Sequence, residues 1–221
     1  MKAMILAAGR GERMRPLTDH TPKPLLMAGG QPLIVHLIRN LVAGGISEII
    51  VNTAHLGHQL STALGDGDAF GANIRYSHET EALETGGGIL KALPMLGDDP
   101  FLVINGDIGT NFPLGRLQHQ AVDLAHLILV PNPFHHPTGD FGLRQGKALG
   151  EGEPRFNFGG IGLYRPSLFE ACPQGRFPLA PLLRSAMATG RVSAELYEGL
   201  WMDIGTIERL EAFGTLIAES A

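Results

Sequence analysis

The sequence has one cysteine and no surplus of positive charge, and each shortage excludes a class of protein. Cys172 is the only cysteine in 221 residues, so no intrachain disulfide can form, as expected in a reducing compartment. The net charge of −5 provides no basic face for nucleic-acid phosphates. We therefore expect no nucleic-acid partner.

Long hydrophobic runs are also missing. No apolar stretch approaches the length that spans a bilayer. The apolar run after Lys2 stops at Gly9 and is followed by basic residues, which is too short and wrongly flanked for a secretory signal. We expect a soluble, cytoplasmic protein without membrane contact, either a monomer or a small homo-oligomer.

Glycine is abundant, with 30 residues in 221, about twice the roughly 7% that is usual. Short apolar runs alternate with helical patterns at 32–45, 55–65, 86–93 (before Pro94), 178–190 and 206–220. This alternation is typical of βαβ units and predicts an α/β fold with a mostly parallel, doubly wound (Rossmann-like) sheet. The predicted strands are Lys2–Ala7, Glu48–Asn52, Asn73–Ser77, Phe101–Asn105, Ala125–Val130 and Phe158–Tyr164.

The amino-acid composition of the chain changes near Asn132. Residues 132–160 are rich in glycine and proline, with short alternating pieces that indicate hairpins or an insertion over the sheet. No linker-like segment or repeat interrupts the chain, so we expect a single domain over 1–221. Within it, we expect 1–130 to be the α/β part, 131–165 a small cover region, and 166–221 the C-terminal helices.

The stretch "LAAGRGERMRPLTDHTPKPL", Leu6 to Leu25, combines a Gly-x-Gly turn with cationic side chains. Glycines let backbone N–H groups turn toward phosphate oxygens. The P-loop pattern is absent, and a dinucleotide-binding loop would need a glycine at Met14 and an acid at Asn52 or Thr53. Taken alone, the stretch is either an unfamiliar phosphate loop or a tight turn with solvated arginines.

Two aspartates follow short apolar runs and are candidates for a metal site. Asp107 ends "FLVINGD", and Asp203 lies in "LWMDIGT". Mg²⁺ prefers one or two carboxylates together with phosphate oxygens. Each aspartate alone is equally compatible with a turn or a helix cap.

Together these stretches resemble the sugar-1-phosphate nucleotidylyltransferases. The family pattern runs Leu-Ala-Ala/Gly-Gly-x-Gly-x-Arg-(Met/Leu)-x-Pro-Leu-Thr and then Pro-Lys-Pro-(Leu/Met), and this chain matches it from Leu6 to Leu25. "NGD" at 105–107 and "WMDIGT" at 201–206 match later landmarks in the same order. The resemblance covers essentially the whole chain.

The resemblance implies that a sugar-1-phosphate oxygen attacks the α-phosphorus of a nucleoside triphosphate and pyrophosphate leaves. It assigns catalytic roles to Lys23 and Arg13, and Mg²⁺ ligation to Asp107 and Asp203. Glu84 stands where the family often has glycine, which leaves the choice of base open. The implied nucleotide-binding residues are Ala8, Gly9, Gly11, Glu12, Arg13, Lys23, Glu79, Thr85, Gly86 and Asn105.

The sugar side rests on weaker patterns. Residues in the cover region stand where the family often binds sugar oxygens, although they are equally compatible with ordinary turns. These are Gly139, Asp140, Glu151, Glu153 and Asn157. We interpret His135 and His136 as loop residues that could line the sugar pocket, because no metal-binding histidine spacing is present.

In its short length and its "LETGGGI" and "NGDI" stretches the chain most resembles those members of the family that use UTP and N-acetylmuramate 1-phosphate. The resemblance therefore implies these substrates, with UDP-N-acetylmuramate for peptidoglycan recycling as the product. The alternatives are guanylyl transfer to mannose 1-phosphate, transfer to another hexose 1-phosphate, and a non-catalytic homologue that binds nucleotide sugars. Gly109 and Asn111 stand where an aromatic and an acidic residue are expected, a change that would loosen the loop after Asp107.

Overall fold

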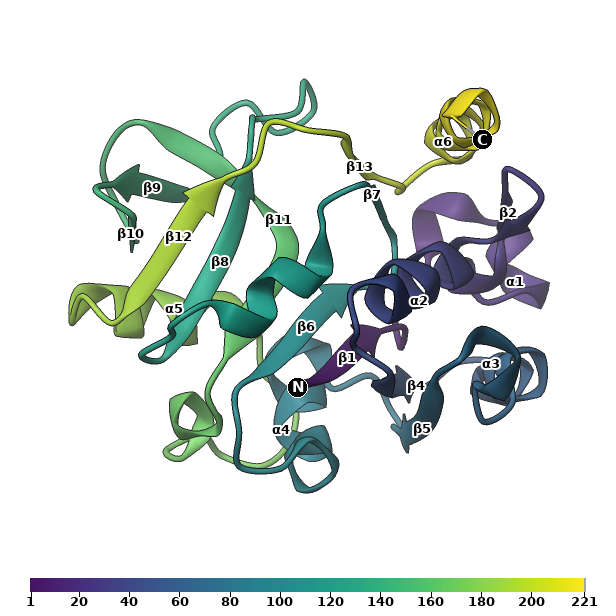
Figure 1. Cartoon of the computed structure of the whole chain (residues 1–221), viewed down its shortest axis with the longest axis horizontal. Helices are drawn as coiled ribbons and strands as arrows, with labels where there is room; N and C mark the ends of the chain where they lie inside the picture. The colour runs from purple at the N-terminus through teal and green to yellow at the C-terminus, as the bar shows by residue number, and fades with distance from the viewer. Residues whose placement is uncertain (221) are drawn as a thin grey trace.

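A nine-stranded sheet runs through this computed structural model, which describes residues 1–220 (Figure 1). The strand order is β5-β4-β1-β6-β11-β8-β12-β10-β9. Two small two-stranded sheets, β2 with β3 and β7 with β13, lie beside it. The strands are β1 (Lys2–Leu6), β2 (Met27–Ala28), β3 (Gln31–Pro32), β4 (Glu48–Thr53), β5 (Asn73–His78), β6 (Phe101–Asn105), β7 (Ile108–Thr110), β8 (Ala125–Val130), β9 (Phe141–Arg144), β10 (Lys147–Leu149), β11 (Arg155–Tyr164), β12 (Val192–Leu196) and β13 (Trp201–Asp203).

The strands β5, β4, β1 and β6 form a parallel half-sheet with helices on both faces. Ala3 and Ile5 of β1 pack on one face with α2, and Met4 packs on the other with α4. Burial on both faces explains why these strands are continuous apolar runs. The carboxyl ends of the four strands therefore meet at one edge of the sheet.

The prediction of a mostly parallel sheet is correct for this half and wrong for the other half. β11 is antiparallel to both of its neighbours, β6 and β8, and the pairings β9–β10 and β10–β12 are antiparallel too. Only β8 and β12 pair in parallel there. The fold is therefore a mixed α/β fold, in which β9 and β10 are joined by a tight hairpin that makes them antiparallel.

Residues 141–164 extend the main sheet instead of lying over it. The register of β11 against β8 shifts between Phe158 and Ile161, and Gly160 there has a φ of 70°. Such a bulge bends a strand. The first part of β11 pairs with β9 while the rest pairs with β6, so β9, β10, β12, β8 and β11 close into a barrel-like ring.

The helices cover the sheet near their predicted positions. Helix α4 runs through Pro94, although the sequence predicts an end before it. Leu96, only 2% exposed, packs in the core beyond that proline and offsets the lost backbone hydrogen bond. The helices are α1 (Leu17–His20), α2 (Leu33–Ala43), α3 (Gly57–Leu64), α4 (Glu84–Leu96), α5 (Leu179–Ala188) and α6 (Ile207–Ser220), with single 3-10 turns at Glu12–Met14, Lys23–Leu25, Asp68–Phe70, Leu114–His119 and Pro166–Phe169.

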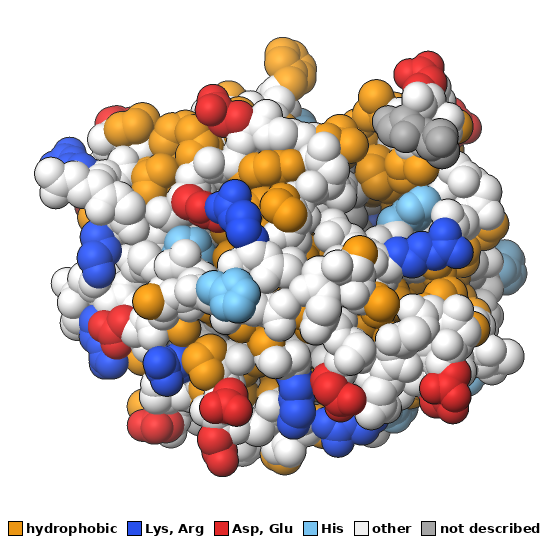
Figure 2. Space-filling model, in the orientation of Figure 1, with side chains coloured by type: hydrophobic (Ala, Val, Ile, Leu, Met, Phe, Trp, Pro, Cys, Tyr) orange, Lys and Arg blue, Asp and Glu red, His pale blue; other side chains and the backbone are white. Residues whose placement is uncertain are grey.

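Helix α6 packs beside β2 and brings the C-terminal segment back to the N-terminal loop (Figure 1). Met14, Leu33 and Phe213 form a small separate core there. On the face shown in Figure 2, basic and acidic side chains are interspersed around the molecule. No helix among the described residues is long and apolar enough to cross a membrane.

Candidate active site

A cavity of about 530 Å³ opens where the parallel strands end. Leu6, Asn52 and Asn105, at the carboxyl ends of β1, β4 and β6, line it, and so does Glu79 immediately after β5. Open α/β sheets bind ligands at this edge. Of the sequence-predicted residues, the cavity wall includes Ala8, Gly9, Gly11, Glu12, Arg13, Lys23, Glu79, Thr85, Asn105 and Asp107.

The loop after β1 keeps its shape through one glycine. Gly11 has a φ of 69°, a conformation that side chains with a Cβ disfavour, and it precedes the 3-10 turn Glu12–Met14. A Cβ at this position would lie 2.9 Å from Cγ2 of Thr18, whose hydroxyl donates a hydrogen bond to the Gly11 carbonyl. The loop is thereby closed tightly against the following turn, with its backbone lining the cavity.

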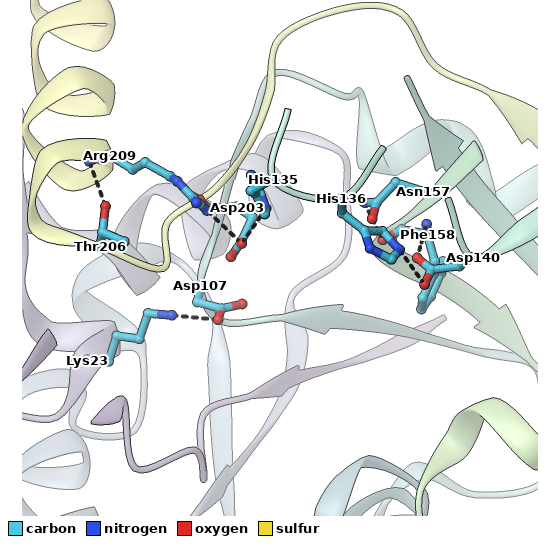
Figure 3. Close-up of polar contacts among 10 residues, drawn as sticks. All are labelled: Lys23, Asp107, His135, His136, Asp140, Asn157, Phe158, Asp203, Thr206 and Arg209. Carbon is cyan, nitrogen blue, oxygen red and sulfur yellow. Dashed lines mark hydrogen bonds and ion pairs between the residues drawn. The ribbon is translucent and has the colours of Figure 1, made fainter. Parts of the chain in front are cut away.

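Lys23 is 7% exposed and points into the cavity from the 3-10 turn Lys23–Leu25. Its Nζ lies 2.6 Å from Oδ2 of Asp107, which follows β6 across Gly106 (Figure 3). The Leu25 backbone N–H donates to the Pro22 carbonyl and closes the turn that carries Lys23. A buried lysine paired with a partly exposed carboxylate forms a fixed charge pair at the sheet edge.

Asp203 approaches Asp107 because β13 pairs with β7. Asp203 stands opposite Ile108, and the Ile204 backbone N–H donates to the Asp107 carbonyl at 2.8 Å. The structure therefore brings together the two aspartates that lie 96 positions apart in the sequence (Figure 3). Two carboxylates from adjacent strands form a donor set that suits a hard divalent cation. Among the described residues, no group of three or more histidine, cysteine, aspartate or glutamate side chains could hold a metal ion.

Arg13 reaches the same region from the N-terminal loop. Its guanidinium lies so close to Gly205 that a Cβ added there would stand 2.8–2.9 Å from three guanidinium atoms. No described residue accepts a hydrogen bond from this guanidinium. Arg13 is thus a positive group in the cavity wall whose donors are available to an anion.

The opposite wall is held by a buried polar network. Asn52 accepts a hydrogen bond from the Ala7 backbone N–H at 2.7 Å and donates to Oε1 of Glu79 at 2.7 Å. The other Glu79 oxygen accepts from the Leu83 backbone N–H. Both carboxylate oxygens of Glu79 therefore already have protein partners, which fixes this wall rigidly.

The glycine run after Thr85 serves helix packing. Gly86 is absent from the cavity wall, and its Cα lies directly against the Phe177 ring, which leaves no room for a side chain. Glu84 has a φ of 60°, which explains on physical grounds why glycine suits this position. Glu84 and Thr85 line the cavity, whereas the three glycines that follow them do not.

The predicted sugar residues divide into two groups, and none lines the cavity. Oδ2 of Asp140 accepts a hydrogen bond from the Phe158 backbone N–H at 2.8 Å, with Gly139 and Asn157 beside them in sequence. Figure 3 shows Asp140 and Asn157 on the same side of the site. Glu151 and Glu153, by contrast, are exposed turn residues without contact to Asp140, and Glu153 accepts from the Arg155 backbone N–H.

Two side chains that border the site, Arg209 and Asn52, were not predicted from the sequence, whereas His135 was. Arg209 donates to Oδ2 of Asp203 at 2.9 Å, and Nε2 of His135 lies 3.5 Å from the same oxygen. Asn52 holds Glu79. His135 is a loop residue as expected, but no local pattern marks Arg209 or Asn52, because their partners lie on other elements.

The loop after Asp107 is well packed despite Gly109 and Asn111. The Phe213 ring of α6 lies directly on the Cα of Gly109, in the space where a side chain would stand. Hydroxyl Oγ1 of Thr110 and the Asn111 backbone N–H both donate to the Leu200 carbonyl. The Phe213 ring of α6 therefore fills the space of the aromatic side chain that position 109 lacks.

A family model of nucleotidyl transferases matches residues 2–147, and the chain belongs to this family. The chain is 50% identical over 221 aligned residues to the N-acetylmuramate alpha-1-phosphate uridylyltransferase of Neisseria meningitidis serogroup B, covering 96% of each chain. It is 33% identical to the enzyme of the same name from Caulobacter vibrioides, covering 99% of this chain and 97% of that one.

A solved structure from Bacillus anthracis, described as a candidate glucose-1-phosphate thymidylyltransferase in complex with sucrose, has the same fold. Its TM-score is 0.87 at 24% sequence identity, and the match covers 99% of this chain and 96% of that one. This likeness concerns the fold alone.

Proposed function

We propose that this chain transfers a uridylyl group from UTP to N-acetylmuramate α-1-phosphate, giving UDP-N-acetylmuramate and pyrophosphate in peptidoglycan recycling. The observation that carries the proposal is the 50% identity to the N. meningitidis uridylyltransferase over 96% of both chains. The cavity geometry supports it, because the Lys23–Asp107 pair lies at the sheet edge beside Arg13 and Asp203.

In the proposed reaction a phosphate oxygen of the sugar 1-phosphate attacks the α-phosphorus of UTP in line. The bond from that phosphorus to the bridging oxygen breaks, and pyrophosphate leaves with the bond's electrons. Such a step needs positioning and charge neutralisation and no covalent enzyme intermediate. Lys23 and Arg13 neutralise the reacting phosphates and the departing pyrophosphate.

The remaining residues hold the two substrates. We assign the triphosphate and nucleoside to the wall formed by Ala8, Gly9, Gly11, Glu12, Glu79, Thr85 and Asn105. The sugar lies on the side of Gly139, Asp140 and Asn157. Asp107 and Asp203 would hold Mg²⁺, which when bound supplies positive charge at the α-phosphate.

The experiment measures pyrophosphate release by the purified protein with Mg²⁺. UTP, GTP, dTTP, ATP and CTP are each tested against N-acetylmuramate, N-acetylglucosamine, glucose and mannose 1-phosphates. We expect release that requires UTP and N-acetylmuramate 1-phosphate together, and we expect a metal chelator to abolish it.

Two other results would contradict this proposal in different ways. Release confined to GTP and mannose 1-phosphate would keep the reaction type and replace both substrates. No release with any pair, from folded protein that still binds a nucleotide, would indicate a non-catalytic homologue.

A further inference from the structure

Arg209, in the first turn of α6, uses only one end of its guanidinium on the protein. Its Nη1 donates to Oδ2 of Asp203 at 2.9 Å and to the Asp203 carbonyl at 3.1 Å. No described residue accepts a hydrogen bond from its Nε or Nη2. The side chain is 26% exposed, so it is only partly enclosed by the protein.

His135 and His136 connect this arginine to the sugar side of the site. Nε2 of His135 lies 3.4 Å from Nη1 of Arg209, and Nε2 of His136 lies 3.1 Å from Oδ1 of Asp140 (Figure 3). The two histidines are neighbours in the chain, so they bridge Asp203 and Asp140. Arg209 is therefore linked through His135 and His136 to the residues on the proposed sugar side.

The proposed substrate carries a second anion that must be accommodated there. N-acetylmuramate differs from N-acetylglucosamine by a lactyl ether on C3, which ends in a carboxylate. C3 is only two carbons from C1, so this carboxylate lies within a side chain's length of the phosphate. The two oxygens of a carboxylate match two parallel guanidinium N–H groups.

We propose that Arg209 binds the lactyl carboxylate of the sugar substrate through Nε and Nη2, with His135 beside it, and so selects N-acetylmuramate 1-phosphate over N-acetylglucosamine 1-phosphate. The inference rests on the proposed function and adds the residue that determines sugar specificity. Asp203 holds the opposite end of the guanidinium and fixes its orientation before substrate binds.

The test compares wild type with Arg209→Lys and Arg209→Gln. Lysine keeps the charge and loses the planar fork, and glutamine loses both. The measurement is kcat/KM with UTP for N-acetylmuramate 1-phosphate and for N-acetylglucosamine 1-phosphate, together with the dissociation constant of each sugar phosphate by calorimetry. We expect the preference for N-acetylmuramate 1-phosphate to fall roughly 10- to 100-fold, mainly through KM and affinity, since charge-assisted hydrogen bonds are lost.

The ratio of kcat/KM for the two sugar phosphates distinguishes this role from mere support of Asp203. A variant that only disturbs Asp203 would lower kcat/KM equally for both sugar phosphates. Equal losses for both would overturn the proposal. Arg191→Lys is the matched control, because Nε and Nη2 of Arg191 form the same kind of fork on Asp123 at a distant surface. It should leave the ratio unchanged.

A second measurement does not depend on how well the variants fold. Amidation of the lactyl carboxylate removes the anion from the ligand, so the amide should bind wild type more weakly than N-acetylmuramate 1-phosphate does. Unchanged affinity of wild type for the amide would also overturn the proposal. A wild type that does not use N-acetylmuramate 1-phosphate at all would instead contradict the proposed function.

Discussion

Lys23 shows how a single residue is prepared for anion chemistry. Its ammonium is buried and already paired with Asp107 at 2.6 Å, so its position is fixed before any substrate arrives. The Asp107 side chain is 34% exposed and can still be reached by a ligand. A charge that is held in place before the reaction stabilises a developing negative charge without further rearrangement.

We predict that Lys23→Ala lowers kcat by about 10²- to 10³-fold, the usual cost of removing one fixed group that stabilises the transition state. Circular dichroism and the thermal midpoint should remain close to wild type, because Asp107 can be hydrated in place of its lost partner. The control is Arg15→Ala in the same loop, since Arg15 is 56% exposed and pairs only with Asp19. Its kcat should stay within about twofold of wild type. Unchanged turnover in the Lys23 variant would remove Lys23 from the reaction.

At the scale of elements, β7 and α6 are packed directly against each other. Gly109 of β7 and Phe213 of α6 share a single space, and Phe213 is 3% exposed. β7 also pairs with β13, which ends at Asp203. Helix α6 therefore packs against the strand pair that brings the two aspartates together.

We predict that Gly109→Trp and Phe213→Ala each destabilise the protein, the first by about 1–3 kcal/mol through overpacking and the second by about 3–5 kcal/mol through a cavity. In the double variant the new ring occupies the space that Phe213 vacates. The loss of unfolding free energy in the double variant should then be smaller than the sum of the two single losses by about 0.5–3 kcal/mol, measured by urea unfolding. Strictly additive losses would show that the two positions do not share a space.

Element positions were predicted better than element directions. The six predicted strands correspond to β1, β4, β5, β6, β8 and most of β11, because burial on both faces leaves continuous apolar runs. β12 has the half-buried sequence VSAEL, which does not stand out from the helix before it. The antiparallel direction of β11 depends on the end of the sheet at which the chain re-enters it, which apolar patterning does not encode.

The candidate site was predictable where a contiguous motif carries it. Residues Ala8 to Lys23 lie together because the chain itself joins them, and Asp107 follows a strand whose end is readily located. Arg209 reaches the site through the packing of α6, and Asn52 through a network that spans 45 positions from Ala7. Such long-range contacts leave no periodic or spaced pattern in the sequence.

At the scale of the whole molecule, stability should depend on pH through one buried histidine. His126 of β8 is 4% exposed, and its Nε2 has no hydrogen-bond partner within the described part of the chain. Burial lowers the pKa of this imidazole below its usual value of 6.5. The negative charge of Glu195 opposes this shift, and the positive charge of Arg116 acts in the same direction as burial. The folded protein therefore favours the neutral form.

The direction of this pKa shift determines whether stability rises or falls with pH. Below pH 6.5 the unfolded chain protonates His126 before the folded chain does, so the stabilisation is complete above pH 6.5 and declines as the pH falls toward the lower folded value. We predict that urea midpoints of wild type fall more steeply between pH 7.5 and 5.5 than those of His126→Asn, in which the other histidines are unchanged. Parallel pH profiles for the two proteins would contradict the prediction.

The closed ring of five strands also removes one edge of the main sheet. An open strand edge presents unpaired backbone groups to which another chain can add. β9 pairs with both β10 and β11, so within the described residues the nine-stranded sheet keeps one open edge, β5. That edge displays the exposed polar side chains of Asn73, Arg75 and His78, which discourage strand addition. Ring closure at one end of the sheet and polarity at the other are both features that disfavour edge-to-edge addition of a second copy.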